Sequence, residues 1–461
     1  VVNAGGTIAF TGNPVNLGSG GHLWADSGGL TVLGAAGNTW GTTTFSNGTM
    51  RMDVANALPA TTNLRIGEIS YGADFSLLDL NGYSQTVGAL RAVSATPTPG
   101  PVDITSATPA TLTVNQSATT TYTGGFTGAV GLTKSGSGTL NLSGASAPTT
   151  NRHTGDTLVT GGTLALGNVD LLQNSTLDTG PSGAQAVTFT VAGTNTYYLG
   201  GLKGADDLAT GSNTISVGAN DQSTSYSGVL GGTGGLTKTG DGTLTLSGAN
   251  TYSGVTTVDD GTLIVDGSIA ASSLTTVADG AILGGSGAVG DLDLYGTLSP
   301  GNSPGTMYTG DETWNGGGTY LWEINDADAT QGQDPGWDFL DITGTLTIAA
   351  TSADPFDIDI TSLALDGSAG PVGDFDPNGV YSWRIATATV DVVGFAPEKF
   401  NLLLGDFDNG WVGGRWEILR DGNSVVLSYA IPEPATVLLL VLGGLCLIAY
   451  RWRKGDRRLS S

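Results

Sequence analysis

Two pairs of aspartates are the first groups in this sequence whose spacing suits chemistry. The pairs are Asp291 with Asp293 and Asp357 with Asp359, each separated by one residue. Residues i and i+2 of a β-strand point to the same face, so each pair could present two carboxylates together. Two carboxylates flanking a bond are the machinery of glycoside hydrolysis. The same spacing is also the ordinary solvent face of an acidic strand, so an enzyme is the alternative hypothesis and a non-catalytic role is preferred.

Two loops place oxygen-bearing side chains at alternate positions, as calcium-binding loops do. The candidate ligands are Asp374, Asp376 and Asn378 in the first loop and Asp406, Asp408 and Glu417 in the second. Glu417 is twelfth counted from Asp406, as the last ligand of an EF-hand is, but Gly410 is fifth where that motif needs a sixth-position glycine. Turns between β-strands have the same composition. Calcium is therefore a secondary prediction, and no other cofactor is expected.

Histidine and cysteine chemistry has few candidates. His22 and His153 are the only histidines, and Cys446 is the only cysteine, so no internal disulfide can form. His153 falls in an insertion between predicted strands and is expected to be an exposed turn residue. The sequence has no HExxH or phosphate-binding motif, and its Gly-x-Gly strings are those that frequent tight turns produce. Catalysis by histidine or by a histidine-bound metal is not expected.

Composition indicates an ordered, turn-rich, all-β protein. The chain has 461 residues, 75 of them glycine, and 39% are hydrophobic, which is too many for a disordered chain. The 41 Asp and Glu outnumber the 16 Lys and Arg, giving a net charge of −25. Such a surface repels phosphate backbones and anionic lipid. Nucleic acid is therefore excluded as a partner.

Internal repeats predict how the strands are arranged. GLTKSGSGTLNLSGA at 131–145 and GLTKTGDGTLTLSGA at 235–249 agree at 12 of 15 positions. From residue 242 onward the Gly-Thr-Leu tripeptide or its variant starts at 242, 261, 280 and 296, steps of 19, 19 and 16 residues, which fit one coil of a β-solenoid. Leucines alternate with polar residues, as in a strand with one buried face. Leu244, Leu263 and Ile282 are predicted to stack on the inner face.

The same patterns divide the chain into regions. Residues 1–300 are predicted to be β-helix repeats, with clear copies at 121–167 and 225–267, and 301–350 to be wider terminal coils. Residues 351–430 are predicted to form an antiparallel β cap whose short strands are Phe356–Ile360, Tyr381–Ile385, Phe400–Leu404, Trp416–Leu419 and Val425–Tyr429. The cap is expected to cover the end of the helix, because a solenoid exposes unpaired strands there.

The last 31 residues, 431–461, read as a sorting signal with three parts. Its motif at 431–434 contains Pro432, Glu433 and Pro434, an apolar stretch follows at 435–450, and the basic tail at 451–461 contains Arg451, Arg453, Lys454, Arg457 and Arg458. Sixteen helical residues span about 24 Å, so the apolar stretch is predicted to be one short transmembrane helix. The basic residues predict that the tail stays cytoplasmic and that the bulk of the chain lies outside.

These motifs resemble two known families. The segments 234–267 and, with an insertion, 128–167 resemble the autotransporter-associated β-strand repeat, also called the passenger-associated transport repeat. That resemblance implies a right-handed parallel β-helix on a bacterial surface. Residues 432–458 resemble the PEP-CTERM sorting signal, which implies exosortase as a partner in the inner membrane of a Gram-negative bacterium, often one that makes exopolysaccharide.

The predicted function follows from the architecture. We expect an exported structural or adhesin-like β-helix protein of the cell surface or extracellular matrix, sorted by exosortase after transient anchoring in the inner membrane, with a biofilm exopolysaccharide as a further partner. The alternative is a carbohydrate-active β-helix enzyme, a polysaccharide hydrolase or lyase. Convergent carboxylates and aromatic platforms in a groove would favour the enzyme, and flat ladders of Thr, Ser and Asn would favour the structural role.

Overall fold

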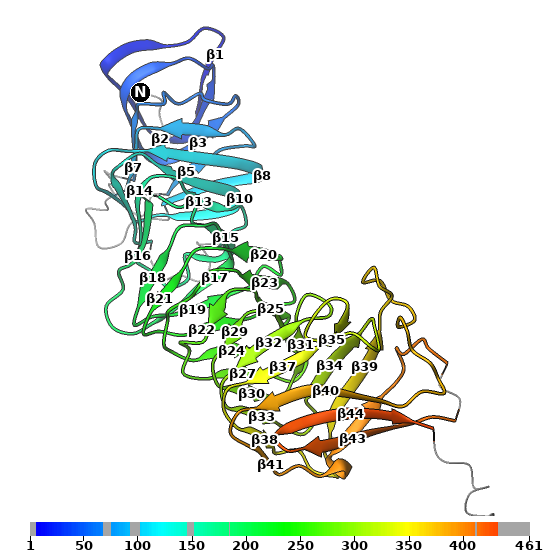
Figure 1. Cartoon of the computed structure of the whole chain (residues 1–461). Coiled ribbons are helices and arrows are strands. Elements are labelled where there is room, and N and C mark those ends of the chain that lie inside the picture. Colours follow the sequence, from blue (N-terminus) through cyan, green and yellow to red (C-terminus); the bar gives the residue numbers. More distant parts are fainter. Residues whose placement is uncertain are drawn as a thin grey trace, which may run out of the picture.

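The computed structural model describes residues 6–67, 75–92, 102–144, 152–183, 185–410 and 413–431. Within these ranges the protein is almost entirely β-structure, and the one helical element is a 3-10 turn, η1, at Pro397–Lys399. The molecule is elongated, with strand β1 at one end and strands β41 to β44 at the other (Figure 1). Prediction of an all-β protein is confirmed.

The largest sheet runs along the molecule, and all its strand pairs are parallel. Its strands are β1 (Thr7–Thr11), β2 (Asn16–Gly34), β3 (Thr39–Met52), β4 (Asn63–Ile66), β5 (Ser76–Asp79), β6 (Gln85–Val87), β7 (Ala89–Arg91), β8 (Val102–Asn115), β10 (Gly125–Ser135), β12 (Arg152–His153), β13 (Thr157–Val159), β15 (Leu172–Asp178), β17 (Thr196–Lys203), β19 (Thr214–Val217), β22 (Leu236–Lys238), β24 (Thr256–Val258), β27 (Thr275–Val277), β30 (Leu292–Leu294), β33 (Glu312–Trp314), β38 (Leu346–Ile348) and β41 (Val392–Val393).

Two further sheets supply a second side of the coils. The first contains β9 (Thr120–Tyr122), β11 (Thr139–Leu142), β14 (Gly162–Leu166) and β16 (Gln185–Phe189), and the second contains β20 (Thr224–Tyr226), β23 (Thr243–Leu246), β25 (Thr262–Val265), β28 (Ile282–Gly285), β31 (Thr297–Pro300), β34 (Thr319–Ile324), β35 (Thr330–Gln331), β36 (Gly336–Trp337), β39 (Phe356–Ser362) and β42 (Phe400–Leu403).

The remaining strands supply a third side. They are β18 (Leu208–Gly211) with β21 (Leu230–Gly232), and a sheet of β26 (Ser268–Ile269), β29 (Ala288–Val289), β32 (Thr306–Thr309), β37 (Phe339–Ile342), β40 (Tyr381–Ala388), β44 (Ser424–Ala430) and β43 (Arg415–Asp421). Each coil therefore contributes one strand to each of several parallel ladders, an arrangement consistent with a β-helix.

The inner face follows the predicted leucine ladder with one correction. Leu244 pairs with Leu263, and both are buried, as predicted. The next rung is Leu283, however, and not Ile282, which pairs with Thr262 instead and is only half-buried. The coil that ends at Ile282 is one residue longer than the 19-residue period. Because strand side chains alternate, a shift by one residue moves the neighbouring side chain to the opposite face.

The coils widen towards the C-terminus, and large aromatic rings fill the interior there. The pairing step grows from Thr262 with Ile282 to Met307 with Leu340 and then to Leu340 with Ala386. Trp314 stacks on Phe356 with centroids 4.6 Å apart and planes inclined by 5°. A wider coil encloses more volume than two facing leucines can fill, so bulky rings replace them.

The antiparallel cap predicted over residues 351–430 is much smaller than expected. Strand β39 pairs in parallel with β34 and with β42, β40 pairs in parallel with β37, and β41 pairs in parallel with β38. Among the strands described there, the antiparallel pairs are those of β44 with its neighbours β40 and β43, and Leu363 and Ala369 form an isolated antiparallel bridge. Most of this region thus continues the parallel ladders, because its strands stack on the preceding coil instead of folding back on one another.

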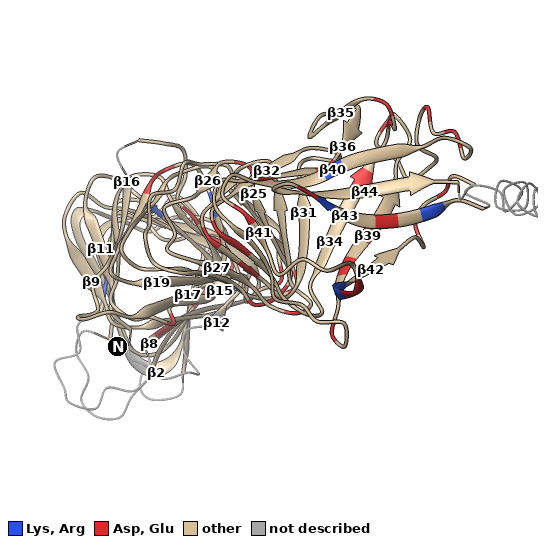
Figure 2. Cartoon of the chain, turned by 60° about the horizontal axis from the view of Figure 1, so that its bottom comes forward, with Lys and Arg blue, Asp and Glu red and all other residues tan. Residues whose placement is uncertain are grey.

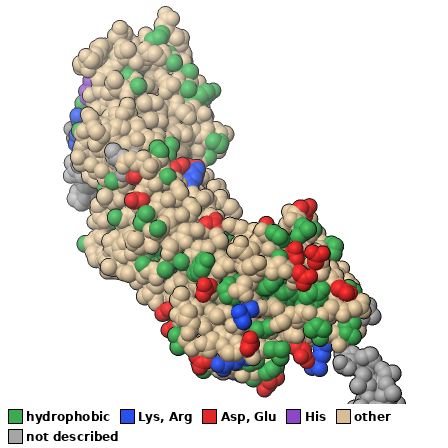
Figure 3. Space-filling view, in the orientation of Figure 1, with side chains coloured by type: hydrophobic (Ala, Val, Ile, Leu, Met, Phe, Trp, Pro, Cys, Tyr) green, Lys and Arg blue, Asp and Glu red, His purple; other side chains and the backbone are tan. Residues whose placement is uncertain are grey.

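Charged residues are unevenly distributed over the molecule. Asp and Glu side chains gather over the later coils, and the early coils present few charges (Figures 2 and 3). Within the described part of the chain, no helix is long and apolar enough to cross a membrane. The helix predicted at 435–450 lies outside the described residues.

Candidate functional site

The predicted sorting residues lie beyond the part of the chain that the structure describes. Pro432, Glu433 and Pro434 directly follow Ile431, the last described residue, and the basic residues of 451–458 come later. Ile431 itself follows β44, whose last residue Ala430 pairs with Arg415 of β43. The sorting motif therefore begins one residue after a strand of the last sheet.

The first calcium candidate loop is organised by its own hydrogen bonds. The Asp376 carboxylate accepts the backbone N–H of Asn378 at 2.9 Å and its side-chain amide at 3.2 Å. Asp374 adopts a left-handed conformation with φ 53°, and its carbonyl accepts the Tyr381 hydroxyl at 3.2 Å. These contacts make the loop a turn that Asp376 stabilises, which is the alternative interpretation of its composition.

Two of the three predicted ligands of the second loop, Asp406 and Glu417, lie near other charged groups. The Glu417 carboxylate lies 2.9 Å from the Arg415 guanidinium on the exposed side of β43. Burial raises the pKa of Asp359. The nearby carboxylate of Asp406 raises it further, and that of Asp357 has a smaller effect in the same direction. No three Asp, Glu, His or Cys side chains of the described ranges are grouped so that they could hold a metal ion.

Calcium binding by these loops stays a prediction that melting experiments can decide. Carboxylates at close range repel one another, so a bound divalent cation should stabilise the fold. The expected result is a higher thermal midpoint of the full chain in calcium than in chelator. Identical midpoints over a broad range of calcium concentration would remove the prediction, and magnesium at equal ionic strength is the control for simple screening.

The two aspartate pairs have different surroundings. Asp357 and Asp359 lie on the outer side of β39, half-buried, and the Asn401 side-chain amide donates to Asp357 at 3.0 Å. Asp291 lies in the turn before β30 and is exposed, while Asp293 lies within β30 and is half-buried. Of these four carboxylates, Asp291 lines a groove on the surface.

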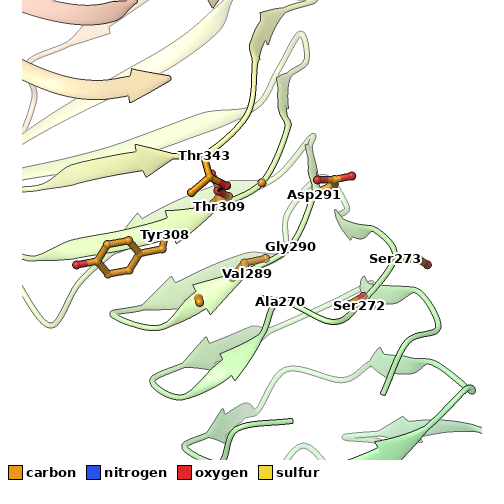
Figure 4. A pocket seen from close by; sticks show the side chains of 11 residues that line it. Ala270, Ser272, Ser273, Val289, Gly290, Asp291, Tyr308, Thr309 and Thr343 are labelled. Carbon is orange, nitrogen blue, oxygen red and sulfur yellow. Dashed lines mark hydrogen bonds between the residues drawn. The ribbon is translucent and has the colours of Figure 1, made fainter. Parts of the chain in front are cut away.

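That groove has a volume of about 410 Å³ and crosses four successive coils at one corner. It is lined by Ala270, Ser272, Ser273, Ala288, Val289, Gly290, Asp291, Tyr308, Thr309, Gly310 and Thr343. Figure 4 shows Tyr308 at one end, Asp291 and Ser273 at the other, and Thr309 and Thr343 between them. We call this surface the corner groove.

Turn lengths explain why this corner is hollow. Between β29 and β30 the chain turns through Gly290 and Asp291 alone, and between β32 and β33 through Gly310 and Asp311. The flanking turns at 270–274 and 343–345 are longer. A Cβ on Gly310 would overlap the Asp291 carboxylate, so a larger residue there would displace that side chain. Two short Gly-Asp turns thus leave a depression between longer neighbours.

Most hydroxyl groups of the groove already have partners. Thr309 donates to the Glu312 carboxylate at 2.8 Å, Thr343 donates to the Thr309 carbonyl at 2.8 Å, and Ser272 donates to the Leu274 carbonyl at 3.1 Å. One oxygen of Asp291 accepts the backbone N–H of Asp311 at 2.9 Å. The groups left for a ligand are the second Asp291 oxygen and the hydroxyls of Ser273 and Tyr308.

A buried lysine occupies the same position in each of the two clear repeats, and we did not predict it. Lys134 lies in the inner ladder between Val114 and Val159. Its ammonium group donates to the carbonyl oxygens of Ser135, Gly136 and Gly161 at 2.8, 2.9 and 2.9 Å. Burial lowers the pKa of Lys134 to about 8, so the side chain remains largely protonated at neutral pH.

Lys238 repeats this arrangement in the second unit. It lies between Val217 and Val258 and donates to the carbonyl oxygens of Thr239, Gly240 and Asp260 at 2.8, 2.6 and 3.1 Å. In both repeats the third acceptor belongs to the next coil. The signal in the sequence was a lysine at an inward position of the alternating Leu-Thr-Lys pattern. Each ammonium group joins two coils through its hydrogen bonds.

The expectation that His153 is exposed is wrong. It is 2% exposed, its Nε2 lies 3.1 Å from the Thr157 hydroxyl, and its ring packs on Phe126 at 5.5 Å. Burial lowers the pKa of His153 to about 4, so the ring is neutral at physiological pH. His153 is therefore a core residue. The residues around His153 are polar, so the sequence did not indicate that His153 pairs with β10.

Comparison with known proteins identifies two motifs in the chain. The model of the passenger-associated-transport-repeat matches residues 132–166 and 236–265, and that of the PEP-CTERM protein-sorting motif matches residues 430–455. A stretch of 128 residues, 27% of the chain, is 44% identical to the adhesin BmaC autotransporter of Brucella suis biovar 1 (strain 1330), of which it covers 4%. The chain therefore spans a small share of that relative. These matches indicate an exported surface protein.

Proposed function

We propose that this chain is a structural, adhesin-like protein of the cell surface or extracellular matrix. In this proposal it is a right-handed parallel β-helix, ended by the small antiparallel cap, and residues 435–450 anchor it in the inner membrane until exosortase acts on Pro432, Glu433 and Pro434. The single observation that supports this best is the combination of stacked passenger-type repeats with a sorting motif at the end of the same chain.

The order of the motif, the apolar stretch and the basic tail suggests how the sorting segment would work. Two prolines cannot donate backbone hydrogen bonds and bias the residues before them towards extended conformations, so Glu433 would be accessible just outside the membrane. The apolar stretch would hold the motif at a fixed depth, and the five basic residues would resist passage through the membrane.

Sorting predicts different products in two hosts. In a host with exosortase, the mature surface protein is expected to lack residues 438–451. In a host without exosortase, the protein is expected to stay in the inner membrane with its bulk outside. Mass measurement of the C-terminal peptide from both hosts checks this.

Two variants separate the motif from general effects on export. Glu433→Ala is expected to abolish processing, whereas Glu398→Ala, which changes an exposed glutamate that also follows a proline, is expected to be processed normally. Should residues 438–451 remain attached in the exosortase-bearing host, a plain membrane anchor would replace the sorting proposal.

The alternative function is a carbohydrate-active enzyme. Its support is the half-buried pair Asp357 and Asp359, with the pKa of Asp359 raised by burial and then by neighbouring carboxylates, as a proton donor requires. Incubating the full chain with a glycan panel and scoring both retention and cleavage distinguishes the two. Cleavage that is lost in Asp359→Asn would establish the enzyme.

A further inference from the structure

We propose that the corner groove binds an uncharged oligosaccharide that lies along the stack of coils. This inference deepens the adhesin-like role proposed above by assigning a ligand class to a defined surface. It depends on four features of the groove, which are its shape, its aromatic ring, its free polar groups and its lack of cationic side chains.

The shape suits an extended chain. The groove runs over the turns of four coils, and three steps of about 4.8 Å give a floor on the order of 14 Å long. Its volume of about 410 Å³ falls in the range of small-ligand sites. The two Gly-Asp turns are shorter than the turn at 270–274, which leaves space over them for a ligand.

Tyr308 supplies an aromatic surface at one end. Its side chain is 46% exposed, because Tyr308 lies on the outward face of β32 between the buried Met307 and Thr309. Its backbone pairs with Ala288 and Asp341, so the point at which the side chain leaves the outer face of β32 is fixed. An exposed ring at the end of a groove can stack on the C–H face of a sugar.

Asp291 and Ser273 supply directed hydrogen bonds at the other end. The Asp311 N–H holds one oxygen of Asp291 at 2.9 Å, so the orientation of the carboxylate is set before any ligand arrives. The second oxygen can accept from a sugar hydroxyl, and a hydrogen bond to a charged acceptor is stronger than a neutral one. Preorganised polar groups lose little entropy on binding.

Charge excludes other ligands. The lining contains Asp291 and no lysine or arginine, and the whole chain has a net charge of −25, so uronic-acid chains and nucleic acids would be repelled. A single carboxylate lines the groove, whereas glycoside hydrolysis generally uses two. The groove is therefore suited to retention of a neutral sugar and not to its cleavage.

Titration of the purified full chain tests this. The chain is prepared in a detergent without a sugar head group and titrated with neutral tetrasaccharides of glucose, mannose, galactose and N-acetylglucosamine, with tetragalacturonic acid as the anionic comparison. At least one neutral probe is expected to bind, and the anionic one is not. Tyr308→Ala and Asp291→Ala are each expected to weaken binding about tenfold.

Tyr295→Ala is the matched control, because Tyr295 is 44% exposed and does not line the groove. It is expected to bind as the wild type does. Failure of every neutral probe to bind, or equal binding by wild type and Tyr308→Ala, overturns the proposal. Since the titration does not depend on sorting, failure here leaves the surface location intact, and a failure of sorting leaves the groove intact.

Discussion

Replacing Glu312 by Gln is expected to stabilise the wide coils by about 3 kcal/mol above about pH 8 and to leave their stability unchanged below about pH 4. Glu312 is 1% exposed, and burial raises its pKa to about 7, against the lowering effect of its hydrogen bonds to Trp314 and Thr309. The Trp314 indole N–H donates to one carboxylate oxygen at 2.7 Å. An amide can keep that bond, and the Thr309 hydroxyl can turn to accept from the new NH2 group.

The direction of the pH effect follows from the raised pKa. Below about 4.5 the carboxyl is protonated in both folded and unfolded chains, so it imposes no cost. Between about 4.5 and 7 the unfolded chain loses its proton first, so the stability of the wild type falls as pH rises. The amide side chain in the Glu312→Gln variant cannot ionise, which removes this part of the loss. Stability also falls with rising pH because of Asp338, whose pKa is raised by burial and then by the neighbouring Glu323. This second pH dependence remains in the Glu312→Gln variant.

Hydrogen exchange of strands β33 and β38 at pH 4, 6 and 8 measures the effect locally. Glu398→Gln, at an exposed position in η1, is the control and is expected to change stability by less than about 0.5 kcal/mol. If Glu312→Gln and the wild type show parallel pH profiles, Glu312 is not the group responsible.

The sequence allowed the strand ladders to be predicted but not every register. Leu244 and Leu263 pair as the 19-residue spacing required, yet Leu283 replaces Ile282 in the next rung. Periodicity gives the mean length of a coil, whereas the inner face depends on the exact length of each turn. The alternation of apolar and polar residues identified β39 and β42 as strands, but it does not indicate whether two strands pair in parallel or antiparallel. The path of the preceding coil decides this, and β39 and β42 pair in parallel.

The corner groove and the buried lysines were missed for related reasons. Asp291 was singled out as one of a pair along a strand, whereas its role at the groove comes from the Gly-Asp turn that recurs at Gly310 and Asp311 in the next coil. Comparing turn lengths between coils could have revealed it. Lys134 sits where the alternation demands an apolar residue, so a general rule that lysine is exposed concealed it.

Replacing Lys238 by Met is expected to destabilise the second repeat by about 2 kcal/mol, seen as roughly thirtyfold faster hydrogen exchange in β22, β24 and β25. Methionine keeps the length and apolar character of the stem, so packing between Val217 and Val258 is preserved. What disappears is the ammonium group, which leaves the carbonyl oxygens of Thr239, Gly240 and Asp260 without that donor.

Two effects oppose each other in this variant, and their sizes decide the sign. Burial lowers the pKa of Lys238, so removing the charge relieves a desolvation cost. Against this, a buried acceptor that loses its partner costs about 1–3 kcal/mol, and three part-buried acceptors are affected here. The third acceptor, Asp260, belongs to the next coil, so the loss also weakens the contact between coils. We therefore expect the cost of the unpartnered carbonyl oxygens to exceed the gain from removing the buried charge.

Lys203→Met is the matched control for this experiment, because it makes the same chemical change on the same sheet. The Lys203 side chain is 36% exposed and pairs with Asp156 at 2.5 Å, and an ion pair open to solvent contributes about 1 kcal/mol at most. Its replacement should leave exchange in β22 to β25 unchanged. If exchange is faster in Lys238→Met and not in Lys203→Met, the result supports the interpretation that Lys238 joins two coils. Equal rates in Lys238→Met and the wild type would mean that water satisfies the three carbonyl oxygens once the ammonium is gone, and that the lysine is tolerated in the core without stabilising it.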